Sequence, residues 1–111
     1  MKIEFNKVEA TTINNFKGGE KFISAKMVTD EDNKIMKNIL VPGASIGEHI
    51  HDITSEIIFI LEGKGKAICN GQEEDLKPGD CHYCPKGYVH TLINNGQENL
   101  VFYAVVPNHE A

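Results

Sequence analysis

The sequence predicts an all-β fold with few or no helices, and two observations support this expectation. Almost every break in the chain is a Gly or Pro beside a polar residue, and the runs between breaks are short and rich in β-branched or aromatic residues. No segment keeps the helical i, i+3, i+4 spacing of apolar residues for more than about two turns. Many short strands at regular spacing are typical of a single antiparallel sandwich or β-barrel.

The predicted strands follow one another along the chain with a polar turn between successive runs. Asp30–Asn33 separates two long apolar runs, which predicts an antiparallel hairpin. Asn70-Gly71 lies between two strand-like runs, and Asn-Gly supplies the positive φ angles that a type I′ hairpin turn requires. The strand-length runs are Phe22–Val28, Lys34–Val41, Glu56–Leu61, Gly65–Cys69, Asp80–Cys84, His90–Asn94 and Leu100–Val106.

Length and charge narrow the classes of protein to which the chain can belong. Its 111 residues suffice for one hydrophobic core and hence for one domain. The formal net charge of −5 argues against nucleic acid or an anionic membrane as the main partner, because phosphate groups are bound by clustered Lys and Arg. No N-terminal run resembles a secretory signal and no stretch is long enough to cross a bilayer, so we expect a cytoplasmic location.

The cysteines do not have the pattern of a disulfide framework. Their number, three, is odd, and their spacing suits a reducing compartment. Cys81 and Cys84 form a C-x-x-C pair, but redox pairs favour a helix N-terminus and this segment has the pattern of a strand. We therefore expect buried strand thiols here rather than a redox centre.

The segment from residue 49 to residue 56 carries metal-ligating side chains at the spacing of a strand. One residue separates His49 from His51, so in a strand both imidazoles point to the same face. Glu56 is an odd number of residues beyond His51, and an unbroken strand would place it on the opposite face. The polar stretch Asp52–Ser55 suits a turn or bulge that resets this alternation and returns Glu56 to the side of the histidines.

A third imidazole follows a second turn signal. Pro85 and Gly87 shape a turn just before His90, which opens a strand-like run and would reach the first two histidines if the sheet folds back on itself. Neutral imidazoles with one carboxylate suit Mn, Fe, Co, Ni, Cu or Zn better than Mg or Ca, which prefer oxygen ligands. A six-coordinate ion would keep two positions for water, substrate or dioxygen, as an open catalytic site does.

Both segments are similar, position for position, to the two sequence motifs of the cupin family. The first motif, G-x5-H-x-H-x4-E-x6-G, is matched by Gly43, His49, His51, Glu56 and Gly63. The second motif, G-x5-P-x-G-x2-H-x3-N, is matched by Gly79, Pro85, Gly87, His90 and Asn94. Two long gapped motifs in the right order are a far more specific signal than an isolated H-x-H.

The resemblance implies a cupin fold, a conical antiparallel β-barrel or jelly roll, with one divalent metal ion held inside by His49, His51, Glu56 and His90. It also implies one cupin domain over residues 1–111, divided into N-terminal strands (1–42), the first motif (43–63), a spacer (64–78), the second motif (79–94) and a C-terminal strand (95–111). Small cupins commonly pair strands between subunits, so the resemblance further predicts a homodimer.

Other polar side chains near the motifs are weaker candidates for the site. His82 is either a fourth imidazole in the cavity or a surface-facing strand histidine, because strand alternation cannot be carried across Pro85. Tyr88, in a loop at the mouth of the barrel, is the aromatic residue best placed to touch a ligand. We expect Asn94 to tie a turn to the barrel wall and His109 to be a tail residue.

Three classes of function are compatible with these features. The first is a metalloenzyme that acts on a small oxygen-rich organic molecule as a dioxygenase, decarboxylase or isomerase, with Ile58 and Ile60 in an apolar wall. Glu48 and His82 are weak candidates for an additional general base. The second class is a module that binds or senses a small molecule without turning it over. The third, a structural cupin, is disfavoured by the complete set of ligands.

Overall fold

Short strands with alternating apolar residues build most of the chain, as the sequence predicts. The computed structural model describes residues 1–110, and within this range the chain forms ten strands and two 3-10 helices but no α-helix. The elements are η1 (Phe5–Lys7), β1 (Thr11–Asn14), η2 (Phe16–Gly18), β2 (Phe22–Thr29), β3 (Asn33–Leu40), β4 (Ser45–Ile50), β5 (Glu56–Glu62), β6 (Gly65–Cys69), β7 (Gln72–Leu76), β8 (Cys81–Cys84), β9 (Val89–Ile93) and β10 (Leu100–Pro107). None of the helices in residues 1–110 has the length and apolar character needed to cross a membrane.

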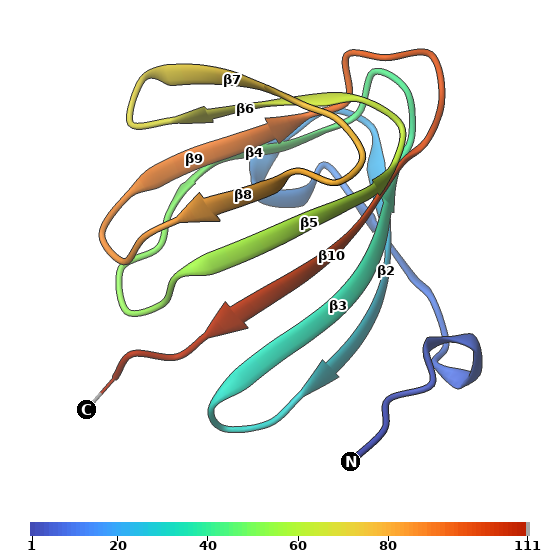
Figure 1. Cartoon of the computed structure of the whole chain (residues 1–111), viewed down its shortest axis with the longest axis vertical. Coiled ribbons are helices and arrows are strands. Elements are labelled where there is room, and N and C mark those ends of the chain that lie inside the picture. The colour runs from blue at the N-terminus through green and yellow to red at the C-terminus, as the bar shows by residue number, and fades with distance from the viewer. Residues whose placement is uncertain (111) are drawn as a thin grey trace.

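Two antiparallel sheets lie against each other and enclose the core. Residues 1–110 form a six-stranded sheet in the order β1-β2-β3-β10-β5-β8 and a four-stranded sheet in the order β4-β9-β6-β7. Figure 1 shows them as two layers, with β7, β6 and β9 stacked above β8, β5 and β10. The core between the layers includes Leu40, Ile58, Leu92 and Phe102, all of them fully buried. The predicted jelly-roll fold class is confirmed, although the two sheets stay separate and do not merge into one closed barrel.

Both hairpins predicted from turn signals are present. Asn70 and Gly71 have φ angles of 48° and 80° and join β6 to β7, as the Asn-Gly signal predicts. The β2–β3 hairpin turns through Asp30–Asn33, where Asp30 Oδ1 accepts hydrogen bonds from the backbone N–H groups of Asp32 and Asn33. Local side-chain chemistry therefore determines both turns.

Two strands lack a recognisable sequence pattern. β1 contains a single apolar residue, Ile13, and β7 reads Gln-Glu-Glu-Asp-Leu with only Leu76 buried. Each forms because a neighbouring strand offers a full edge of unpaired backbone groups: β1 pairs with β2, and β7 pairs with β6 across the tight turn. Tertiary pairing overrides weak local propensity in these segments.

A close backbone approach attaches η2 to β4. A Cβ atom on Gly47 would lie 2.0 Å from the carbonyl oxygen of Lys17, so only a residue without a side chain fits there. The contact brings Phe16 and Lys17 to the same cavity as His49, which lies two residues beyond Gly47 on β4.

Asn94 holds the loop between β9 and β10 against the end of β3. Its buried amide nitrogen donates hydrogen bonds of 2.8 Å to the carbonyl oxygens of Leu40 and Glu98, and its Oδ1 accepts one of 3.0 Å from Gly96 N–H. Every polar atom of the side chain is thus used for structure, as the sequence predicts for this residue.

Replacing Asn94 with Ala should destabilise the fold by about 2–3 kcal/mol, because the buried carbonyl of Leu40 would lose its donor and the loop would lose its other two hydrogen bonds. Urea denaturation followed by circular dichroism measures the change. Asn95→Ala, at the exposed neighbouring position, is the control and should change the free energy of unfolding by less than about 0.5 kcal/mol. Equal stability of the two variants would contradict the assigned role of Asn94.

Candidate metal centre

A bulge in β4 directs the histidine pair toward the interior. His49 lies opposite His90 on β9, and the register between β4 and β9 shifts by one residue between Ile46 and His49. Without the shift, Ile46 and His49, three residues apart, would face opposite sides of the sheet. With it, Ile46, His49 and His51 all line one cavity.

The loop after His51 carries the chain from one sheet to the other. β4 belongs to the four-stranded sheet, and Glu56 is the first residue of β5 in the six-stranded sheet. Asp52–Ser55 is therefore the turn that the sequence predicts, but it restores the alternation by changing sheets: Glu56 faces the histidines from the opposite wall.

Hydrogen bonds from both directions hold this loop. The hydroxyl of Thr54 lies 2.8 Å from His51 Nδ1, which leaves Nε2 of that ring facing the interior. The C-terminal segment supports the outer side, since His109 N–H donates to the carbonyl of Ile53 at 2.7 Å and its ring Nε2 lies 2.8 Å from the hydroxyl of Ser55. His109 thus fastens the loop from outside the cluster and is more than the tail residue that the sequence suggests.

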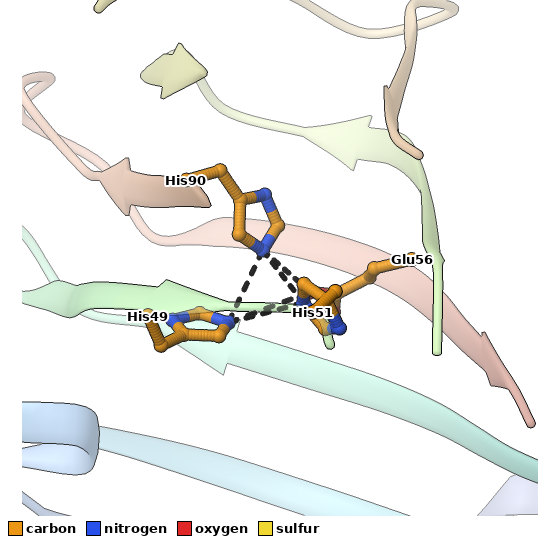
Figure 2. Close-up of side chains that lie close together, drawn as sticks. All are labelled: His49, His51, Glu56 and His90. Carbon is orange, nitrogen blue, oxygen red and sulfur yellow. Dashed lines mark hydrogen bonds and ion pairs between the residues drawn. The ribbon is translucent and has the colours of Figure 1, made fainter. Parts of the chain in front are cut away.

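Four potential ligand atoms converge between the sheets. The Nε2 atoms of His49, His51 and His90 lie 3.0 to 3.2 Å from one another. Glu56 Oε1 lies 3.1 Å from His51 Nε2, 2.9 Å from His90 Nε2 and 4.0 Å from His49 Nε2. Figure 2 shows the ring nitrogens turned toward one another with Glu56 beside them. The structure brings together all four residues that the motifs single out as metal ligands.

The electrostatics of the cluster favour the form that binds cations. Burial by itself would raise the pKa of Glu56, but hydrogen bonds from His51 and His90 lower it to about 2, so its carboxylate is ionised at neutral pH. Burial lowers the pKa of His49 and favours its neutral imidazole. Metal ligands must be deprotonated before they bind, and these two side chains already meet that condition.

The spacing of the donors matches part of an octahedron. With metal–ligand distances of about 2.1 Å, adjacent octahedral donors lie about 3.0 Å apart and opposite donors about 4.2 Å apart, whereas a tetrahedral shell would place every pair about 3.4 Å apart. Five of the pairs here measure 2.9 to 3.2 Å, and one, between His49 and Glu56, measures 4.0 Å. A set with one opposite pair occupies four corners and leaves two adjacent corners free. The residues therefore fit a divalent transition metal ion with two open positions.

A cavity of about 210 Å³ opens onto His49, His51 and Glu56. Four larger hollows, of about 240 to 560 Å³, include none of the four clustered residues. The smaller cavity is thus the one that gives access to the candidate metal centre.

Polar groups that the sequence analysis missed line this cavity. Lys17 and Lys34 lie at its wall, together with Asn38, which is 3% exposed. The Asn38 amide nitrogen contacts only the sulfur of Met36, at 3.8 Å, and within residues 1–110 its Oδ1 has no hydrogen-bond partner. The inward alternation of β3, with buried Met36 and Asn38, is the signal that could have identified them.

The weaker sequence candidates lie outside the cavity lining. His82 is buried rather than surface-facing, and it contacts the side of His90 that points away from the cluster. Tyr88 is 42% exposed, and Glu48 is exposed too. Ile58 and Ile60, both expected in the cavity wall, belong to the hydrophobic core and do not line the cavity.

The C-x-x-C pair is split between the two faces of β8. Cys81 is exposed and Cys84 is buried, as strand alternation requires for residues three apart. Burial, together with the nearby Cys69, raises the pKa of Cys84 to about 12, so it is a thiol at neutral pH and a poor nucleophile. This arrangement agrees with structural strand cysteines, except that only Cys84 is buried.

Comparisons with known proteins agree with the fold and the cluster. A family model described as "Cupin domain" matches residues 38–106. An oxalate-binding protein of Thermotoga maritima is 29% identical over 112 residues, which cover 96% of this chain and 93% of that protein. The crystal structure of a "predicted oxalate decarboxylase" from Thermotoga maritima superposes with a TM-score of 0.91 at 27% identity, covering 97% of this chain and 99% of that one. Quercetin 2,3-dioxygenase of Bacillus subtilis is 26% identical over 87 residues, or 78% of this chain but 26% of that enzyme.

Replacing His51 with Ala should lower metal affinity by more than about 100-fold, because it removes one of four donors and leaves the ion with only three protein ligands. Protein purified without chelators would be analysed by mass spectrometry for its metal content. We expect about one ion per chain in the unchanged protein and a substoichiometric amount in the variant. Asn95→Ala changes an exposed residue away from the cluster and should keep the metal. Unchanged metal content in His51→Ala would contradict the assignment.

Proposed function

Because this chain belongs to the cupin domain family, we propose that it holds one divalent transition metal ion through His49, His51, Glu56 and His90 and uses it to act on a small oxygen-rich organic acid. The reaction type that we favour is that of a metalloenzyme such as a decarboxylase, dioxygenase or isomerase. The observation that carries the proposal is the donor spacing, which leaves two adjacent corners free for a ligand.

Two adjacent open corners suit a chelating ligand. Oxalate or a 2-oxo acid presents two oxygen atoms separated by two carbon atoms, and both oxygens can bind one ion side by side. The cavity opens onto His49, His51 and Glu56 rather than onto His90, so a ligand would approach from that side. The bound ion would supply charge stabilisation to the oxygens of the ligand.

The size and charge of the cavity support a small anion. Its volume of about 210 Å³ lies below the ~300 Å³ at which pockets for drug-sized molecules begin. Lys17 and Lys34 at the wall would attract and orient a carboxylate. Glu56 is the one acidic residue among those that line the cavity within residues 1–110, and a metal ion would neutralise it. The small volume and the positive charge of the cavity wall both favour an acid of a few carbon atoms over a three-ring flavonoid.

The side-chain oxygen of Asn38 would accept a hydrogen bond from the protonated end of such a ligand. Its buried Oδ1 lacks a donor, and a hydroxyl or protonated carboxyl group in the cavity would satisfy it. Met36, Ile46 and Val106 supply an apolar surface around it that excludes water. These residues bind and orient the ligand, and none of them is placed to take up a proton.

The relatives support the same class of ligand. One is named for oxalate binding, and one solved structure for a predicted oxalate decarboxylase; each matches nearly the whole of this chain. The quercetin dioxygenase match covers about a quarter of that enzyme, so it supports a shared domain more than a shared substrate.

Binding without turnover is the second candidate, and the cavity lining favours it in one respect. Within residues 1–110, the lining offers no carboxylate, Cys or Tyr beyond Glu56, and its two lysines and two histidines are the remaining titratable groups. If the histidines hold the metal, a general base is lacking. A binding or sensing cupin needs none.

The unchanged metal-loaded protein should bind oxalate, and Lys34→Met should weaken binding about tenfold by removing a charged partner of the ligand. Isothermal titration calorimetry measures both affinities. Lys37→Met is the matched control, because Lys37 lies on the same strand and faces Tyr103 on the outer side. Equal affinities for the two variants, or tight binding of quercetin with none of oxalate, would contradict the small-acid proposal.

A turnover assay separates the enzyme from the binding module. The metal-loaded protein would be incubated with oxalate and with 2-oxo acids while carbon dioxide release and oxygen uptake are recorded. We expect release or uptake that disappears in His51→Ala. Tight binding without either signal for any acid of the panel would favour the binding module.

A further inference from the structure

We propose that Glu74 and His82 are positioning residues that fix the tautomer of His90 and thereby raise its affinity for the metal. This inference rests on the proposed metal centre, since it concerns how one ligand of that centre is prepared. It assigns a role to two residues that do not line the cavity and are not among the fixed positions of either sequence motif.

His82 lies directly behind His90. It belongs to β8 in the six-stranded sheet, is 1% exposed, and its Nε2 lies 3.0 Å from His90 Nδ1. The two rings stack with centroids 5.3 Å apart and planes 15° apart. Nδ1 of His82 contacts the carboxylate Oε1 of Glu74, on β7 of the four-stranded sheet. A continuous chain of contacts therefore runs from Glu74 through His82 and His90 to the cluster.

The directions of the hydrogen bonds are determined from the outer end. A carboxylate of Glu74 accepts only, so His82 must carry its hydrogen on Nδ1 and donate it. The Nε2 of a neutral His82 is then an acceptor, and His90 must donate to it from Nδ1. This arrangement favours the His90 tautomer whose Nε2 lone pair is free for a metal ion, and it opposes Glu56 Oε1, which lies 2.9 Å from that nitrogen and favours a hydrogen there in the metal-free protein.

Glu74, at the outer end of this series of contacts, points away from the acidic side chain beside it on β7. β7 carries three consecutive acidic residues, and such a run ordinarily forms a solvated face. Glu73 pairs with Lys66 at 3.4 Å on the outer side, whereas Glu74, at the next position of the strand, faces His82. The side chain of Glu74 is still 50% exposed, so its replacement does not open the core.

Orientation of this kind has a measurable effect on metal binding. Partners of metal-ligating histidines commonly change metal affinity by about 10- to 100-fold, because they hold the ring and its tautomer in the binding form. Without an acceptor at position 74, His82 can move its hydrogen to Nε2 and donate to His90. The hydrogen of His90 then moves to Nε2, the nitrogen needed for the metal.

The test compares Glu74→Ala, Glu74→Gln and Glu73→Ala. Glu74→Ala removes the acceptor, Glu74→Gln keeps an amide oxygen as acceptor without the charge, and Glu73→Ala removes an equal charge from the same strand. Zinc affinity would be measured by competition with a chromophoric chelator. The tautomers of His82 and His90 would be read from ¹⁵N NMR of the metal-free proteins.

We expect zinc binding to weaken about tenfold or more in Glu74→Ala, and the share of metal-free protein with His90 protonated on Nε2 to rise above that of the unchanged protein. Glu74→Gln should recover most of both properties, and Glu73→Ala should match the unchanged protein. Equal zinc affinities and tautomers in all three variants would overturn the inference alone. An equal loss in all three would show that charge, not the hydrogen-bond chain, is responsible, and would also overturn it. Failure of the unchanged protein to bind zinc or another divalent transition metal would overturn the metal centre itself.

Discussion

The convergence of three imidazoles and one carboxylate between two sheets is the constraint on which the rest of this structure depends. Polar groups that are buried must find partners, and here their partners are one another. His51, Glu56 and His90 are each at most 7% exposed, yet their donor and acceptor atoms lie within hydrogen-bonding distance. An ion at this point would replace these mutual contacts with stronger ones, because all four residues already point at it.

Pairing within one sheet and a crossover to the other sheet bring this point together from β4, the start of β5 and β9. The bulge in β4 turns His49 inward, the Asp52–Ser55 loop carries Glu56 to the opposite sheet, and antiparallel pairing with β4 sets His90 beside His49. The contact of Gly47 with η2 closes one wall of the cavity. A one-residue shift in the register of β4, β5 or β9 would turn a ligand to the other face of its strand, since side chains alternate.

The two sides of the cluster serve different purposes in the proposed function. The cavity side carries lysines, an unpaired amide and apolar side chains, and it would determine which ligand is accepted. The far side is closed by His82 and Glu74, and it would determine how His90 presents its nitrogen. Substrate choice and metal affinity are thus assigned to different residues, which allows them to be changed independently.

Features that depend on near neighbours along the chain could be predicted from the amino-acid sequence. It predicted the all-β class, the Asn70-Gly71 turn and the common face of His49 and His51, because turn preferences and strand alternation act over a few residues. The polar stretch Asp52–Ser55 predicted a turn that returns Glu56 to the histidines, and the resemblance to the cupin family added His90. The strand β7 and the burial of His82 against His90 became visible in three dimensions alone. β7 has almost no apolar residues and forms by pairing with β6, and β8 and β9 follow each other in the sequence but belong to different sheets. The contact of His82 with His90 therefore follows from packing between the sheets, which no local pattern records.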